Sequence, residues 1–178
     1  MAKKKNFFVR DYNKHIGATV LLVACMLSFM FMVIGTPLGV LKPKEATNVC
    51  YTLWGTRKCD SPNYDWRVNF DNCTVRRVRF HFAEAFSIIA MFFNVLTGIA
   101  CWYCISGSNA KWWTVLVAVI SIASSLVTWS VVSALYYSSF CGSDTYTHKH
   151  TKYGPGFALI VTAFALDCCG LVCFLVLG

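Results

Sequence analysis

Four long apolar segments divide this chain of 178 residues and constrain its fold more than any other feature. They cover about residues 16–40, 80–105, 112–137 and 156–178. Each is long enough to cross the roughly 30 Å hydrocarbon core of a bilayer at about 1.5 Å per helical residue. Lipid offers no partner to a backbone N–H or C=O group, so a spanning segment must be a helix or belong to a closed barrel. The alternating strands of a barrel are not seen. The sequence therefore predicts an all-α membrane protein, a four-helix transmembrane bundle forming one domain.

The composition agrees with this class of protein. Hydrophobic residues make up 57% of the chain and charged residues 13%, whereas a soluble domain carries about 25% charged residues. The mean hydropathy is +0.55. The first apolar segment follows Lys3, Lys4 and Lys5, but it is too long and starts too late for a cleaved signal peptide. We expect it to be an uncleaved signal-anchor.

Two loops, residues 41–79 and 138–153, decide the expected orientation. They carry more basic residues than the opposite side, which disfavours an outer position by the positive-inside rule. They also hold four cysteines, an even number as disulfides in an oxidising compartment require, and Asn72 begins a glycosylation sequon. We therefore expect outer loops, cytoplasmic termini and a location in the plasma membrane. The net charge of +8 then places N-terminal lysines against the anionic inner leaflet, and the dispersed basic residues argue against binding of nucleic acid.

The most distinctive stretch is residues 50–60, which read CYTLWGTRKCD. Its Tyr, Thr, Leu and Trp favour a pleated, half-buried surface, and Gly55 permits a tight reversal. The stretch predicts a strand, a turn and a strand, with Cys50 and Cys59 on either side of the turn. A generic loop hairpin stapled by these two cysteines is one interpretation. From the residues alone three pairings are open for the loop cysteines Cys50, Cys59, Cys73 and Cys141.

The same stretch resembles the signature of amastins, small surface glycoproteins of kinetoplastid parasites. The two differ at the end, where Cys59 precedes Asp60 and the family places the acidic residue first. The four spans, the long first loop, the short second loop and the total length also look like amastins. The signature positions are Cys50, Tyr51, Thr52, Leu53, Trp54, Gly55, Arg57 and Cys59.

Amastins are in turn similar to claudins in layout, and this likeness implies a small antiparallel β-sheet in the first outer loop. Claudins carry a Leu-Trp pair before two cysteines in that loop, and this chain has such a pair before Cys59 and Cys73. The analogy implies a disulfide between Cys59 and Cys73, which leaves Cys50 for Cys141. The resemblance also implies a role in contact between an intracellular parasite and its host compartment.

Polar residues inside the apolar segments are candidate sites, because charged groups in a membrane are costly. Glu84 and Asn94 lie on one face of the second segment, among mostly small or polar residues, and Asp167 lies near the middle of the fourth. We expect Asp167 to be protonated or hydrogen-bonded to Asn94 or to a hydroxyl group of the third segment. Glu84 is expected to meet His81 or Arg79. Such contacts indicate a structural clasp, and the alternative is a path for protons or ions.

The chain shows no phosphate loop, no paired nucleophile and base, and no closed set of metal ligands. We therefore expect no enzyme, cofactor or metal. The sequence predicts a surface glycoprotein whose disulfide-braced loop meets a neighbouring or host membrane component, with lipids around its helices. A hypothesis from another class is a small transporter or channel subunit that uses Glu84 and Asp167, which predicts measurable flux. Assembly of copies into strands is a weaker third hypothesis.

Overall fold

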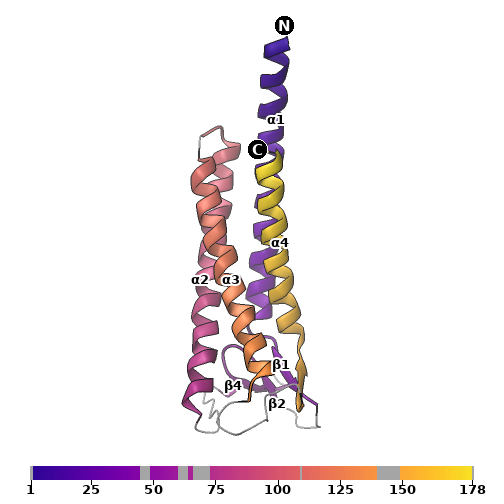
Figure 1. Ribbon diagram of the computed structural model, residues 1–178, viewed down its shortest axis with the longest axis vertical. Coiled ribbons are helices and arrows are strands. Elements are labelled where there is room, and N and C mark those ends of the chain that lie inside the picture. Colours follow the sequence, from indigo (N-terminus) through magenta and orange to yellow (C-terminus); the bar gives the residue numbers. More distant parts are fainter. Residues whose placement is uncertain are drawn as a thin grey trace.

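The computed structural model describes residues 2–44, 49–59, 64–65, 73–108, 110–139 and 149–177. Its four helices are α1 (Ala2–Gly35), α2 (Thr74–Ile105), α3 (Lys111–Tyr137) and α4 (Pro155–Leu177). The part of α1 over Ile16–Gly35 and the whole of the other three are long and apolar enough to cross a membrane. The predicted four-helix membrane bundle is confirmed (Figure 1).

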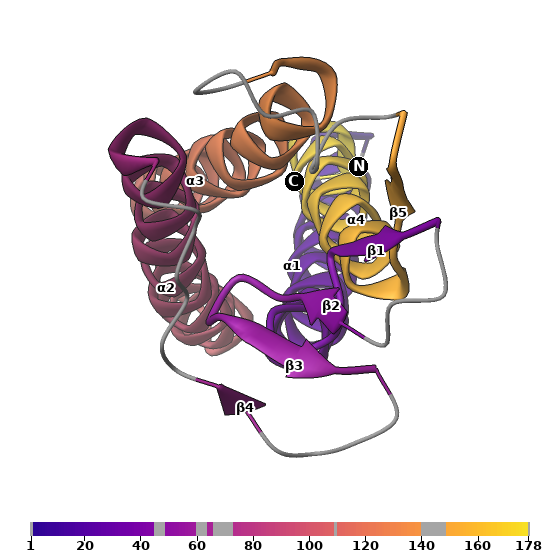
Figure 2. The same cartoon turned by 90° about the horizontal axis from the view of Figure 1, so that it is seen from below.

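The helices form a ring in which α1 and α3 each lie between α2 and α4 (Figure 2). Consequently α2 and α4 stand on a diagonal of the bundle. The N- and C-termini lie at one end of the bundle and the β-strands at the other (Figure 1). The shared position of the termini follows from the even number of spans.

Small residues allow α1 and α4 to approach each other closely. A Cβ atom added to Gly170 would lie 2.8 Å from the Cβ of Ala24, and one added to Gly156 would lie 2.5 Å from the carbonyl oxygen of Gly35. Glycine at such positions lets helix backbones approach closely. In lipid there is no hydrophobic force between helices, so this close van der Waals packing is a main source of their association. Large apolar side chains cover the outside of the helices instead.

A small antiparallel sheet lies at the end of the bundle opposite the termini, mainly on the side of α1 and α4 (Figure 2). Its strands lie in the order β4-β3-β2-β1-β5. The strands are β1 (Leu41–Pro43), β2 (Val49–Tyr51), β3 (Thr56–Lys58), β4 (Tyr64–Asp65) and β5 (Thr151–Tyr153).

The predicted sheet in the first loop is confirmed, and β5 extends it from the second loop. Leu41 of β1 pairs with Tyr153 of β5, so the connection before α4 is tied to the connection after α1. Both Leu41 and Thr151 are fully buried. One face of this two-stranded ladder therefore packs inward.

Candidate functional site

The signature segment forms a closed turn between β2 and β3. The Thr52 hydroxyl and the Thr52 N–H both donate to the Gly55 carbonyl oxygen, at 2.7 and 2.8 Å, and the Gly55 N–H donates back to Thr52 Oγ1 at 3.0 Å. Gly55 has a φ of 150°, in the positive range that favours glycine. Leu53 and Trp54 form the tip of this turn.

The tip points into the bundle. Leu53 is 2% exposed and belongs to a buried cluster with Met32 of α1 and Ile160 of α4, and Trp54 packs against that cluster. The Leu53 N–H also faces the carbonyl oxygen of Thr36 at 3.4 Å. The signature thus packs into the end of the bundle that carries the sheet and fixes the sheet to it. The sequence predicted the hairpin, but its half-polar pattern gave no sign that the tip is a core element.

A disulfide joins Cys50 to Cys59, with 5.1 Å between their Cα atoms. The pairing of Cys59 with Cys73 and of Cys50 with Cys141, taken from the claudin analogy, is therefore wrong. In the register of the hairpin Cys50 faces Arg57, so Cys59, two residues further along, lies on the same face as Cys50 and within bonding reach of it.

Cys73 is disulfide-bonded as well. It lies directly before α2, where the chain returns to the bundle. The expected glycosylation site, Asn72, and the cysteine Cys141 fall outside the described residues. The described disulfides therefore belong to the end of the molecule that carries the sheet.

Three polar side chains meet near the middle of the bundle. Asn94 Nδ2 of α2 donates to Ser28 Oγ of α1 at 2.9 Å and to Asp167 Oδ2 of α4 at 3.2 Å. Ser28 Oγ donates to the same Asp167 oxygen at 2.8 Å. Asp167 is 3% exposed. We call Ser28, Asn94 and Asp167 the clasp, because it joins three helices.

The expected contact between Asp167 and Asn94 is confirmed, whereas no hydroxyl group of α3 takes part. Ser121 of α3 donates instead to the Ala90 carbonyl oxygen of α2 at 3.2 Å, and the Ser125 hydroxyl donates to the carbonyl oxygen of Ser121 within α3. Sequence reasoning missed Ser28. The available signal was a hydroxyl group near the middle of Ile16–Gly35, at a depth similar to that of Asp167.

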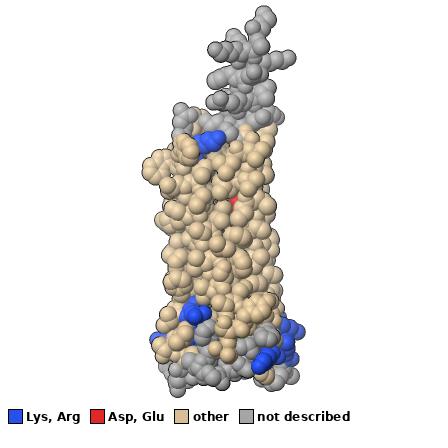
Figure 3. Space-filling view, in the orientation of Figure 1, with Lys and Arg blue, Asp and Glu red and all other residues tan. Residues whose placement is uncertain are grey.

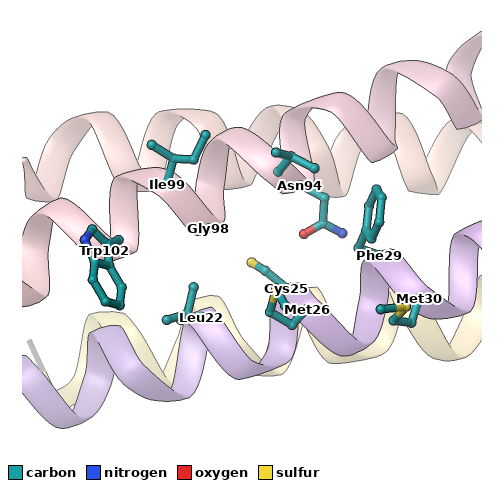
Figure 4. A pocket seen from close by; sticks show the side chains of 10 residues that line it. Leu22, Cys25, Met26, Phe29, Met30, Asn94, Gly98, Ile99 and Trp102 are labelled. Atoms are coloured by element: carbon teal, nitrogen blue, oxygen red, sulfur yellow. The ribbon is translucent and has the colours of Figure 1, made fainter.

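The clasp borders a groove between α1 and α2 (Figure 4). The Asn94 amide points toward α1, between Cys25 and Phe29 (Figure 4). The groove has a volume of about 360 Å³ and is otherwise lined by apolar side chains such as Leu22, Met26 and Ile99. Among the described atoms, Asn94 Oδ1 and Asp167 Oδ1 have no hydrogen-bond partner.

The model of the family described as amastin surface glycoprotein matches residues 26–174. The chain belongs to the amastin family. Neither a curated protein nor a solved structure matches this amastin. The family is one of surface glycoproteins and not of enzymes, and together with the four spans it makes the chain a multi-pass membrane protein.

The second intramembrane acid of this amastin lies apart from the clasp. Glu84 Oε2 contacts His81 Nδ1 at 3.1 Å, which confirms one of its two expected partners. His81 is 62% exposed, so this pair lies at the surface of α2. Ten helical residues, about 15 Å along the axis, separate Glu84 from Asn94. Within the described residues, no three His, Cys, Asp or Glu side chains gather to hold a metal ion.

Proposed function

We propose that this amastin is a non-enzymatic protein of the plasma membrane whose braced outer sheet contacts a component of a neighbouring or host membrane. The observation that carries this proposal is the burial of Thr52 and Leu53 in the end of the bundle. It ties the sheet to the helices, and the Cys50–Cys59 disulfide joins the two strands of the hairpin at the end away from the buried tip. A surface held rigid in this way loses little conformational entropy when it binds.

The expected orientation has two supports. The termini share one end of the bundle, and the described disulfides lie at the other end (Figure 1). The free cysteines among the described residues all lie in the helices. Because disulfides persist in oxidising compartments, the sheet faces the outside and the termini face the cytoplasm.

A labelling experiment tests this orientation. An amine reagent that cannot cross membranes is applied to intact cells, and modified lysines are identified by mass spectrometry. We expect Lys58 and Lys152, both exposed on the sheet, to be labelled. Lys111, at the start of α3, should react only after the cells are permeabilised. Labelling of Lys111 alone in intact cells would show that the orientation is inverted.

An adhesion experiment tests the contact role. Cells that display the full chain are compared with cells that display Leu53→Ser, which removes the apolar anchor of the sheet, and with Leu126→Ser on the exposed face of α3 as a control. We expect weaker attachment to a target cell layer for the Leu53 variant at equal surface abundance. Equal attachment of cells displaying the unaltered chain and either variant contradicts a contact role. Attachment of cells lacking the protein that equals attachment of cells displaying it contradicts the role as well.

The buried carboxyl group of Asp167 favours a second candidate function, transport of protons or ions. Its Oδ1 atom is buried and has no partner among the described atoms. The clasp interpretation accounts for more of the structure, because Glu84 lies about 15 Å along α2 from Asn94, the α2 partner of Asp167, and is already engaged with His81. Proton or cation flux into proteoliposomes that is lost in Asp167→Asn would support transport, and its absence in the unaltered chain would support the clasp.

A further inference from the structure

Basic side chains line the outward face of the ladder between β1 and β5. Lys42 lies directly opposite Lys152, and the backbone N–H of Lys44 donates to the His150 carbonyl oxygen at 2.7 Å, which continues the same register. Side chains opposite each other, and side chains two residues apart on one strand, share a face of a sheet. Lys44, His150 and Lys152 are exposed and Lys42 is half-buried. We call these four residues the basic platform.

The platform is assembled from two loops that are far apart in the sequence. The opposite face of the ladder, with Leu41 and Thr151, is buried against the bundle. The basic side chains therefore point away from the helices. In the space-filling view, blue side chains gather at the lower right of the molecule, at the end where β1 and β5 lie (Figure 3).

Two lysines at directly opposite positions repel each other and weaken strand pairing. Protection of a sheet edge accounts for a lysine on an edge strand such as β5. It does not account for Lys42, because β1 lies between β2 and β5. Of the side chains that the structure describes, the acidic ones are Glu84 and Asp167, both in helices, so none of them balances this pair. An external anion would balance the charges of Lys42 and Lys152.

We infer that the basic platform binds a sulfated polysaccharide on the partner surface. A polysaccharide with closely repeated sulfate groups offers several anions to side chains whose Cβ atoms stand roughly 5–7 Å apart on a sheet. Lysine suits this ligand because it acts as a compact point charge and does not need the planar geometry of arginine. Anionic phospholipids are concentrated in the cytoplasmic leaflet, on the far side of the membrane from the platform.

The inference rests on the proposed outer position of the sheet. It also gives a reason for the excess of basic residues in the loops, which by charge counting alone argues against that position. Lysines that serve as a binding surface are selected for their partner and not for topology.

Binding of the full chain to immobilised heparin tests the inference. The protein is held in nanodiscs of neutral phosphatidylcholine at about 0.15 M salt, close to physiological ionic strength. We expect the double variant Lys42→Gln/Lys152→Gln to bind about three- to tenfold more weakly, the change expected for two exposed ion pairs. The charge-preserving double variant Lys42→Arg/Lys152→Arg should bind within about twofold of the unaltered chain. Higher salt should weaken binding of the unaltered chain.

Lys58→Gln is the matched control on the same sheet. Lys58 is exposed on β3, three strand spacings or roughly 14 Å from β5, and it should lose little affinity. Equal losses for Lys58→Gln and for the double variant, or no heparin binding at all, would overturn the platform. An unchanged thermal unfolding temperature and an intact Cys50–Cys59 disulfide establish that each variant is folded.

A second arm separates the ligand from an anionic membrane. Vesicles containing phosphatidylserine are floated with the same nanodiscs, and dextran sulfate and uncharged dextran compete for heparin binding. Competition by dextran sulfate alone supports the inference, and vesicle binding without heparin binding overturns it. If the platform does not bind heparin but the labelling and adhesion experiments succeed, the proposed contact function still stands. If intact cells are labelled at Lys111 and not at the sheet, both the contact function and the polysaccharide site are wrong.

Discussion

Asn94 of α2 donates a hydrogen bond to Asp167 of α4 across the diagonal of the bundle, with 3.2 Å between Nδ2 and Oδ2. Each helix of this ring contacts its two neighbours, whereas α2 and α4 stand across the ring from each other (Figure 2). Ser28 of α1 completes the connection by bonding both residues. The clasp therefore fixes the relative positions of three helices at one depth, which side-chain packing between neighbours alone does not do.

Asp167→Asn and Asp167→Leu should separate acceptor capacity from charge. The asparagine variant keeps an acceptor oxygen for Ser28 and Asn94, so its stability should stay close to that of the unaltered chain. The leucine variant removes the oxygen that accepts from both Ser28 and Asn94, and the loss of these two hydrogen bonds costs roughly 1–2 kcal/mol. Ser28 then keeps only the Ala163 carbonyl oxygen at 3.3 Å, and Asn94 keeps only Ser28 Oγ at 2.9 Å. Unfolding in mixed detergent measures both. Cys169→Leu, at an exposed position of the same helix, is the control. Equal stability of the two Asp167 variants contradicts the clasp.

Ser28→Ala should destabilise the bundle by roughly 0.6–1.7 kcal/mol, between the average and the maximum found for a single hydrogen bond between membrane helices. The hydroxyl group both donates to Asp167 and accepts from Asn94, so one substitution removes two contacts. Ser124→Ala is the matched control, because Ser124 is also buried but bonds to the Ile120 carbonyl oxygen of its own helix. The same unfolding assay compares them, and a smaller loss for Ser28→Ala than for Ser124→Ala speaks against the assignment.

Hydropathy predicted the helices because the membrane imposes length and internal hydrogen bonding on each span separately. Depth and helical period similarly brought Asn94 and Asp167 together. Neither rule says which helices are neighbours, so the third partner was sought on α3 and found on α1 as Ser28. The joining of β5 to β1 was missed for a related reason. Pairing between distant segments depends on the path of the whole chain, and three-residue strands carry little pattern of their own.

Gly170→Ala and Gly98→Ala should change stability in opposite directions. A Cβ at Gly170 would lie 2.8 Å from the Cβ of Ala24, so α1 and α4 must separate, at a cost of about 1–3 kcal/mol. A Cβ at Gly98 of α2 meets only Leu22 Cδ1, at 3.7 Å. There the helix propensity of alanine should add up to about 1 kcal/mol. Thermal unfolding in one detergent provides the comparison, and a stabilising Gly170→Ala would show that the helices do not meet there.

Peptide mapping without reduction should find Cys50 joined to Cys59. Trypsin cleaves after Arg57 and Lys58, so the disulfide holds together two peptides that separate on reduction. Among the described cysteines six are free and Cys73 is bonded, so we expect the Cys73 peptide to carry Cys141. A bond between Cys59 and Cys73 would restore the claudin-like pairing and remove the hairpin staple.

Cys50→Ser should destabilise the sheet end of the molecule by about 2–3 kcal/mol, since the disulfide closes a short loop with a sequence separation of 9 and constrains the unfolded chain. Cys59→Ser removes the same bond, so the double variant should lose no more than either single variant. Cys169→Ser, a free cysteine at an exposed position of α4, is the control and should be neutral. Hydrogen exchange of the β2 and β3 amides should rise in both single variants, while the amides in the centres of the helices should stay protected. The reason is that the hairpin is held to the bundle mainly by the Leu53 tip, so it can open without separation of the helices. Additive losses in the double variant would mean that each cysteine has a different partner.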